Sequence, residues 1–299
     1  MIARAIGVEL LDGRALAVVI DGDGRVTARA TAEQSPLDAA ASHALDQVSA
    51  GVDGAIGLAT ALPESSAVVD AVAALGRRVK AVASASLVPS GTAAALAEAW
   101  VGAARGAGDV AFFAVADHAI GGLVRRGLPV GGSRGRAASV GWLALNPVER
   151  EDYRRAGCLE AEVAAAGIVR RLVWRIKAGD RSRVLDHVGG DMAAITVDHV
   201  LSAARGGDGV SISVMRDTAK YLGMAAANLV AIFDPEVLVL GGMMASAADL
   251  LLDPVRTEIT RRLPRPMIDA LTIAPAALGA DAAAIGAARL AASALSGGA

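Results

Sequence analysis

Residues 216–244 read RDTAKYLGMAAANLVAIFDPEVLVLGGMM, and the order of helix and strand in this stretch decides the fold. Its first part completes a helical pattern over residues 209–233. The run PEVLVLGG then predicts a fully apolar strand that ends in the glycine pair Gly241-Gly242. Glycines at a strand end let a ligand or another backbone approach closely. Because such glycines also serve plain helix–sheet packing, both roles stay open for this pair.

Alternating strands and helices continue on both sides of this stretch. A polar break at Asp117-His118 separates two apolar strands, and the C-terminal segment predicts strand, turn and helix. The predicted strands of this half lie at 110–116 and 119–125, and its helices lie at 158–177, 197–206 and 209–233.

The N-terminal part opens with two β-rich runs, at 3–10 and 15–20, which Asp12-Gly13 joins. Asp-Gly between apolar runs is a hairpin signal. The pattern then predicts strands at 25–31, 54–60 and 78–84 and helices at 36–49, 63–76 and 92–106. Antiparallel strands followed by alternating strands and helices indicate mixed sheets flanked by helices. We expect an α/β protein of two domains, 1–106 and 107–299, with the boundary in a small-residue stretch at 104–108.

Composition excludes several classes of protein. The 29 lysines and arginines nearly balance the 31 aspartates and glutamates, so no electrostatic footprint for nucleic acid exists. A single cysteine forbids an intramolecular disulfide. Charges interrupt the apolar runs of the N-terminus, and no apolar run reaches the ~18 residues of a membrane span. We expect a cytoplasmic protein.

The stretch 216–244, the closing helix AALGADAAAIGAARLA (276–291) and the run 119–142 resemble the ROK family of repressors, open reading frames and sugar kinases. The opening strands and GTAAALAEAW (91–100) fit the same family. The resemblance implies the actin/hexokinase-like (ribonuclease H-like) fold of two α/β domains around a cleft. It also implies a homodimer. Because the chain begins at its first strand, we expect it to lack the DNA-binding domain of repressor members.

The family's structural zinc motif is degenerate. Trp142 stands at its histidine, Glu151 and Tyr153 stand at its first two cysteines, and only Cys158 remains. Zinc needs about four such ligands, so we expect no zinc site, with Trp142 filling the vacated space. Cys158 is interpreted as a small packed residue, with a reactive thiol as the alternative.

The catalytic base is also replaced. Active members place an Asn-Asp pair before the helix GTAAALAEAW, and its aspartate accepts the sugar hydroxyl proton. Pro89 and Ser90 stand there. A serine has no useful basicity near neutral pH, so Ser90 is interpreted as the helix N-cap.

Both phosphate loops have changed. The family's Asp-x-Gly-Gly-Thr becomes ELLDG (9–13), and its Gly-Thr-Gly becomes ADH (116–118). Carboxylates repel a polyphosphate unless a metal lies between them. Glu9 keeps the acidic first position, so ATP with magnesium stays open as a ligand, and Asp117 is a weak substitute for the base.

On the sugar side, the Glu-x-Gly-His segment becomes SVGW (139–142), so Ser139 and Trp142 replace two polar contacts. Glu160 matches a carboxylate that relatives aim at the sugar; alternatively it is a first-turn helix carboxylate. Gly241, Gly242 and Gly279 match residues that line the adenosine side of the cleft in relatives.

These substitutions predict a catalytically degenerate pseudokinase that acts by binding a ligand or a partner. Two alternatives remain. One is an ATP-dependent sugar kinase with an unusual base such as Asp117. The other is a regulatory homodimer related to ROK transcriptional regulators. A sugar or a nucleotide is the small molecule that such a protein would bind.

Overall fold

The computed structural model describes residues 4–49, 55–78 and 87–296. The strands are β1 Ala5–Leu11, β2 Arg14–Ile20, β3 Val26–Glu33, β4 Ile56–Thr60, β5 Leu87–Pro89, β6 Val110–Val115, β7 Ala119–Arg125, β8 Leu128–Pro129, β9 Val237–Gly242 and β10 Thr272–Pro275. The α-helices are α1 Leu37–Val48, α2 Ser66–Arg78, α3 Ser90–Val101, α4 Glu151–Ala156, α5 Cys158–Val163, α6 Ala165–Lys177, α7 Arg183–His187, α8 Val197–Arg205, α9 Gly209–Phe233, α10 Met243–Ser246, α11 Ala248–Thr260, α12 Arg265–Ala270 and α13 Ala282–Ser296. Three short 3-10 helices are η1 Val140–Trp142, η2 Met192–Ala194 and η3 Gly279–Asp281.

The chain divides into two compact units. Unit 1 comprises Met1–Phe112, Gly121–Ala138 and Ala276–Ala299, and unit 2 comprises Phe113–Ile120 and Ser139–Pro275. Unit 1 thus takes up the C-terminal helix and part of the β7–β8 region. This division differs from the boundary near residue 106 that the sequence suggests, and that boundary stays a prediction.

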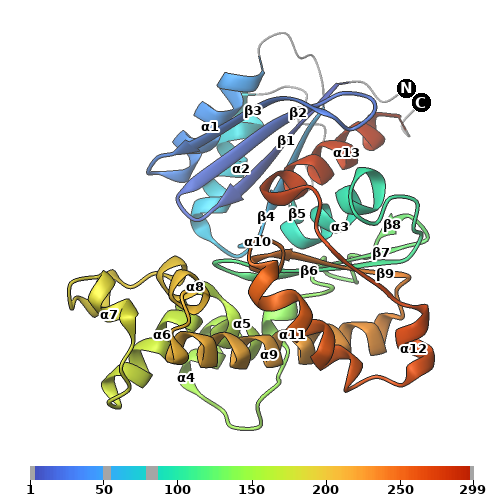
Figure 1. The fold of residues 1–299 in the computed structure, drawn as a ribbon. Coiled ribbons are helices and arrows are strands. Elements are labelled where there is room, and N and C mark those ends of the chain that lie inside the picture. The colour runs from blue at the N-terminus through green and yellow to red at the C-terminus, as the bar shows by residue number, and fades with distance from the viewer. Residues whose placement is uncertain (1–3, 50–54, 79–86, 297–299) are drawn as a thin grey trace. The chain divides into compact units, whose positions relative to one another are not determined.

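The sheet of unit 1 has the strand order β3-β2-β1-β4-β5 (Figure 1). Strands β1, β2 and β3 are antiparallel neighbours, whereas β4 and β5 continue the sheet in parallel with β1. The β1–β2 turn is Asp12-Gly13, with Gly13 at φ 65°. Glycine adopts this left-handed conformation without steric cost, and the predicted hairpin is confirmed.

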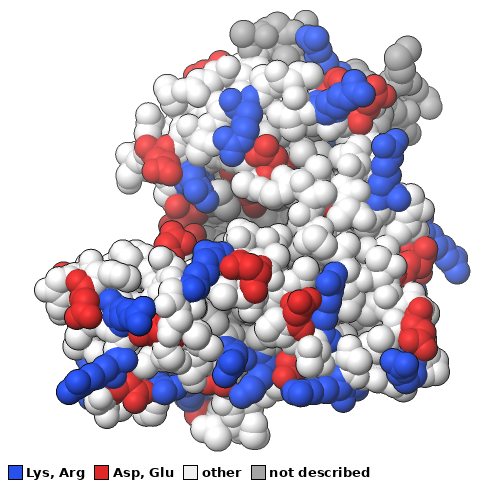
Figure 2. Space-filling model, viewed as in Figure 1, with Lys and Arg blue, Asp and Glu red and all other residues white. Residues whose placement is uncertain are grey.

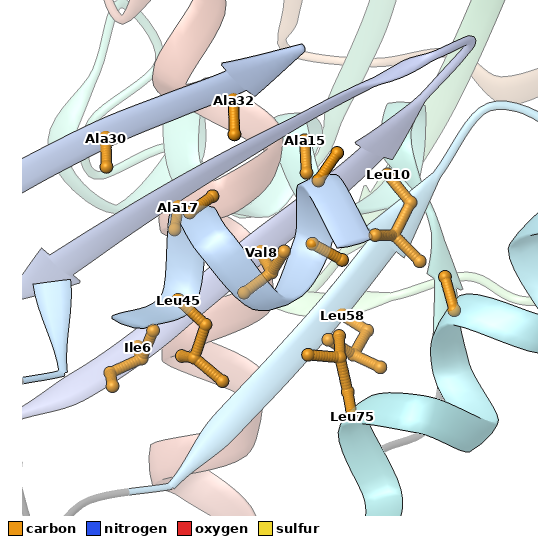
Figure 3. Close-up of a cluster of buried hydrophobic side chains, with 14 of the residues drawn as sticks. Ile6, Val8, Leu10, Ala15, Ala17, Ala30, Ala32, Leu45, Leu58 and Leu75 are labelled. Atoms are coloured by element: carbon orange, nitrogen blue, oxygen red, sulfur yellow. The ribbon is translucent and has the colours of Figure 1, made fainter. Parts of the chain in front are cut away.

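Alternation along the strands gives this sheet two apolar faces. Ile6, Val8 and Leu10 of β1 point to the side covered by α1 and α2, where Leu45 and Leu75 meet them (Figure 3). The opposite face packs against α3 and α13 and takes the other residues of the strands, among them Ala5, Leu16, Val18 and Ile20. Successive side chains of a strand point to opposite faces, so a sheet buried on both sides needs strands that are apolar throughout.

The second sheet has the order β10-β9-β6-β7-β8. It is mixed, because β9 and β10 are parallel whereas β7 and β8 are antiparallel. In unit 2, the long helix α9 packs against α5, α6, α8 and α11. Helix α9 begins at Gly209 because the Asp208 carboxylate accepts a hydrogen bond from Ser211 N at 2.9 Å. It ends before Asp234, which adopts a left-handed φ of 50°.

One predicted helix is interrupted. The expected helix 158–177 is split into α5 and α6 at Ala164, whose backbone is extended. The amide of Ala165 donates to the carbonyl of Ala116 in the β6–β7 turn at 3.0 Å. A tertiary hydrogen bond therefore replaces one helical bond. The predicted strand 78–84 lies almost wholly outside the described residues.

The charged side chains of both signs are mixed on the visible face of the molecule (Figure 2). Lys and Arg are interspersed with Asp and Glu over the face shown in Figure 2. Within the described ranges, no helix is long and apolar enough to cross a membrane.

Candidate functional site

Ser90, which is predicted to stand at the position of the catalytic base, is buried and hydrogen-bonded within unit 1. Ser90 begins α3 directly after the short strand β5. Its hydroxyl donates a hydrogen bond to Glu9 Oε1 at 2.6 Å, and Ser90 and Glu9 are only 1% and 7% exposed. The interpretation of Ser90 as the N-cap is wrong, because Pro89 precedes the helix and no side chain caps it. The hydroxyl is directed to Glu9 instead.

Burial dominates the electrostatics of Glu9. It raises the pKa of this carboxyl to about 7, although the Ser90 hydrogen bond and the positive charge of Arg14 lower it. The negative charge of Asp281 raises the pKa further. Near neutral pH, Glu9 is therefore present in both its charged and its neutral form.

In unit 2, Glu160 organises the β6–β7 turn. One of its oxygens, Oε2, accepts a hydrogen bond from the Ala119 amide at 2.9 Å, and Oε1 lies 3.1 Å from His118 Nδ1. The amide of Ala116 donates to the carbonyl of His118 within the same turn. Glu160 lies in the first turn of α5, as its alternative interpretation expected. The contact with His118 was not predicted, because 42 residues separate the partners.

The segment 139–142 lies against the same carboxylate. Gly141 is so close to Glu160 that a Cβ there would lie 3.3 Å from Glu160 Oε2. Gly157, at φ 90°, permits the carbonyl of Gly141 to approach, because a Cβ at Gly157 would overlap it. The structure thus brings Glu160 together with the 139–142 segment and the β6–β7 turn. Ser139 and Trp142 themselves are exposed.

A cavity of about 580 Å³ in unit 2 includes both Asp117 and Glu160 in its wall. Arg150, Arg155 and Arg170 line it as well. Its size falls in the ~300–1,000 Å³ range of small-molecule sites. Of the predicted site residues, Asp117 and Glu160 therefore share one hollow. Glu9 and Ser90 form a separate pair in unit 1.

The degenerate zinc motif is filled by packing and hydrogen bonds. Cys158 is buried in a cluster with Tyr153 and Ala161. The Tyr153 hydroxyl donates to Glu162 Oε1 at 2.5 Å, and Glu151 pairs with Arg155. The expectation for Trp142 is wrong, since 60% of this residue is exposed and it fills no space beside Cys158.

These residues do not fit a zinc ion. Tyr153 is a hydrogen-bond donor here, and burial raises its pKa above the usual range for a phenol. One thiol then remains, whereas zinc needs about four ligands. In the part of the chain that the structure describes, no group of three His, Cys, Asp or Glu could hold a metal ion.

Removing the Tyr153 hydroxyl tests the replacement network. We expect Tyr153→Phe to lower the free energy of unfolding by about 1–3 kcal/mol, because the buried Glu162 carboxylate loses a donor. Arg150 Nη1, at 3.2 Å, would remain as a partner. The matched control is Tyr221→Phe, whose hydroxyl only accepts a longer bond of 3.4 Å from Asn146. Urea denaturation measures both; an equal loss in the two variants would contradict the network.

The glycines assigned to the adenosine side have different surroundings. Gly242 has φ 59°, and a Cβ there would overlap the carbonyl of Val115, so this glycine permits backbone contact within unit 2. Gly241 is buried. Gly279, at φ 56°, is exposed and has no atom within 4 Å of its Cβ position. Backbone packing accounts for Gly242, and a nucleotide role for the three glycines stays a prediction.

A comparison with known proteins shows the family of this chain. The model of the ROK family matches residues 86–294. A glucokinase of Halalkalibacterium halodurans is 34% identical over 197 residues, which cover 64% of this chain and 59% of the glucokinase. The matched part thus spans less than two thirds of that relative.

Two solved structures share the fold. The ROK family glucokinase of Streptomyces griseus, in complex with glucose and AMPPNP, has a TM-score of 0.80 and 25% identity, and the match covers 96% of this chain and 99% of that one. A ROK family transcriptional regulator, a homologue of the Escherichia coli MLC protein, has a TM-score of 0.78 at 18% identity, covering 98% of this chain and 78% of that one. The second likeness concerns the fold alone.

The fold is therefore common to a kinase and a regulator, and it is the actin/hexokinase-like fold that the sequence predicts. Because the family match extends over more than half of the chain, the conclusion is plain: the chain belongs to the ROK family and is sugar-kinase-like.

Proposed function

We propose that this ROK family member binds a small ligand without transferring a phosphoryl group. The observation that carries the proposal is the hydrogen bond from Ser90 to Glu9. A general base must accept the proton of the sugar hydroxyl. The Ser90 hydroxyl at that position instead donates a hydrogen bond to the buried Glu9 carboxyl, so Ser90 itself offers no basic atom to a sugar hydroxyl.

The two loops that would be expected to bind phosphate support the same proposal. Backbone amides cradle phosphates in loops that leave those amides free. In the β6–β7 turn, the Ala116 and Ala119 amides already donate to the His118 carbonyl and to Glu160. In the β1–β2 hairpin, Leu10 is fully buried and Asp12 adds a negative charge. These residues do not fit a polyphosphate, and Glu9 is committed to Ser90 rather than to a magnesium ion.

The cavity beside Glu160 supports ligand binding. Its wall combines carboxylates and arginines, which hydrogen-bond to the hydroxyl groups of a sugar, and alanines that form an apolar floor. Glu160 is held in place by His118 and Ala119, which fixes the direction of its remaining lone pairs. We infer that a neutral sugar is the class of ligand.

Two measurements on one protein sample test the proposal. With Mg-ATP and a panel of hexoses and N-acetylamino sugars, we expect ADP release no greater than without sugar. Thermal unfolding should shift upward with one of the sugars, since a ligand at a hundred times its dissociation constant adds about 2.7 kcal/mol. Glu160→Gln should abolish that shift, whereas Glu149→Gln, at an exposed ion pair with Arg154 outside the cavity wall, should keep it. Sugar-dependent ADP release would overturn the proposal.

A sugar kinase with an unusual base is the second candidate. It is favoured by the position of Asp117, which lines the same cavity as Glu160 and precedes the His118–Glu160 pair. The carboxylate of Asp117 would take the proton as the sugar oxygen attacks the terminal phosphorus of ATP. This candidate requires ADP release that falls by about 10²-fold or more in Asp117→Asn. The same loss in Glu149→Gln, an exposed residue outside the cavity wall, would indicate a general electrostatic effect instead.

A further inference from the structure

A second cavity, of about 910 Å³, lies within unit 1 and shares no lining residue with the first. Its wall combines the β2–β3 turn, the last turns of α3 and the middle of α13. Arg25, Arg105 and Arg289 line it, with Asp23 as the one opposing carboxylate. Two positive charges are therefore in excess around a hollow whose volume is typical of a small-molecule site.

Arg289 at the wall of this cavity has an unfulfilled hydrogen-bonding group. Its Nη1 is buried and has no hydrogen-bond partner among the residues that the structure describes. Burial lowers the pKa of its guanidinium, and no carboxylate offsets this. Leaving such a group without a partner costs about 1–3 kcal/mol. The residue as a whole is only partly buried and lines the cavity, so an anion there would pair with a guanidinium that no carboxylate neutralises.

The guanidinium of Arg289 is fixed by an aromatic ring. Its Cζ lies 4.5 Å from the centroid of the Trp100 ring, which is a cation–π geometry. Gly24 packs closely against the same ring. Its φ is 82°, and a Cβ there would lie 2.8 Å from the Trp100 ring and from Val101. The ring and the cation are thus positioned before any ligand arrives, which lowers the entropic cost of binding.

We propose that this cavity binds a small phosphomonoester. Guanidinium groups bind phosphate through paired N–H donors, and three arginines line this cavity. The volume exceeds what inorganic phosphate needs, and the wall also presents Trp100, Leu96 and Ile285. The phosphate therefore lies on the arginines, and the organic part of the ester lies against these apolar side chains. The site is independent of Glu9, Ser90 and Glu160.

Calorimetric titration of the full chain tests this with four probes: glucose 6-phosphate, AMP, inorganic phosphate and glucose. We expect at least one ester to bind more tightly than inorganic phosphate, and glucose not to compete with it. Arg289→Gln should weaken the ester about tenfold or more, which is the loss of one charged hydrogen bond. Arg216→Gln, an exposed arginine of α9, removes the same charge elsewhere and should leave the affinity unchanged.

Three results would overturn the proposal. They are the absence of ester binding at millimolar concentration, an equal loss in Arg216→Gln, and an ester affinity that Arg289→Gln leaves intact. If Arg289→Gln fails to fold, the rim variant Arg105→Gln, at an exposed residue, gives the same test, with a several-fold loss expected. Quenching of tryptophan fluorescence that disappears in Trp100→Phe would locate the ester at this cavity.

Discussion

Replacing Gly286 by alanine is expected to lower the free energy of unfolding by about 3 kcal/mol or more, whereas the same change at Gly76 is expected to raise it by about 0.5–1 kcal/mol. Both glycines lie inside helices, Gly286 in α13 and Gly76 in α2. A Cβ at Gly286 would overlap the carbonyl of Ala93 in α3, whereas a Cβ at Gly76 meets nothing within 4 Å. The packing around each glycine, rather than helix propensity, therefore decides whether alanine lowers or raises the free energy of unfolding.

The size of the expected loss follows from what surrounds α13. Gly7 of β1 and Gly57 of β4 also have Cβ positions that overlap backbone carbonyls of α13, at Ala284 and Ala287. The helix therefore lies in backbone contact with the sheet and with α3. Overpacking usually costs about 1–3 kcal/mol because side chains can change rotamer. Here the clashing atoms are backbone on both sides, so a whole helix must move.

Urea denaturation of the two variants and the wild-type protein checks this prediction, with the slope compared to verify that the same surface is exposed. Gly286→Ala should shift the midpoint down and Gly76→Ala should shift it up. A midpoint for Gly286→Ala within experimental error of the wild type would show that α13 can slide away from α3 at no cost. That outcome would contradict the packing argument.

The fold was predictable where the signal is local. The Asp12-Gly13 hairpin, the helix 209–233 and the apolar strand before Gly242 each carry their own pattern, and each is confirmed. The break at Ala164 was not predictable, because neither glycine nor proline marks it. It results from the hydrogen bond between Ala165 and Ala116, 49 residues away. Tertiary contacts of this kind override local propensity.

The candidate site was predictable as a set of substitutions but not as a geometry. The resemblance to the ROK family predicts that Ser90 stands in place of the base. It does not indicate that the hydroxyl donates to Glu9, since 81 residues separate the two. The prediction for Trp142 was wrong for a different reason. A large apolar residue suggests burial, but 60% of Trp142 is exposed. The space beside Cys158 is closed by Tyr153, whose partner Glu162 carried no signal in the sequence.

Glu9 should make the protein less stable as the pH rises, and Glu9→Gln should remove this dependence. The pKa of Glu9 in the folded protein is about 7, above the value of 4.5 for an unperturbed glutamate. Between these values the folded state binds more protons than the unfolded state. The free energy of unfolding therefore falls as the pH rises from about 4.5, and the loss is complete above about 7. The total loss is about 3 kcal/mol.

Glutamine is the matched replacement because it resembles the neutral carboxyl and can still accept the Ser90 hydrogen bond. At pH 5 we expect Glu9→Gln and the wild type to unfold at similar urea concentrations. At pH 8 the variant should be more stable by about 2 kcal/mol, since it avoids a buried charge. Glu33→Gln, at an exposed residue of β3, should follow the wild type at both pH values.

The same denaturation measurements, repeated with added magnesium, decide whether Glu9 binds a cation. A buried carboxylate that binds magnesium is stabilised in its charged form, so added magnesium would raise the stability of the wild type at pH 8 and leave Glu9→Gln unchanged. We expect no such difference, because Ser90 donates to one carboxylate oxygen, Oε1, and Glu9 is only 7% exposed. Magnesium-dependent stabilisation confined to the wild type would contradict the commitment of Glu9 to the Ser90 hydrogen bond. It would also revive the kinase hypothesis, since the first acidic position would then hold the metal that phosphoryl transfer requires.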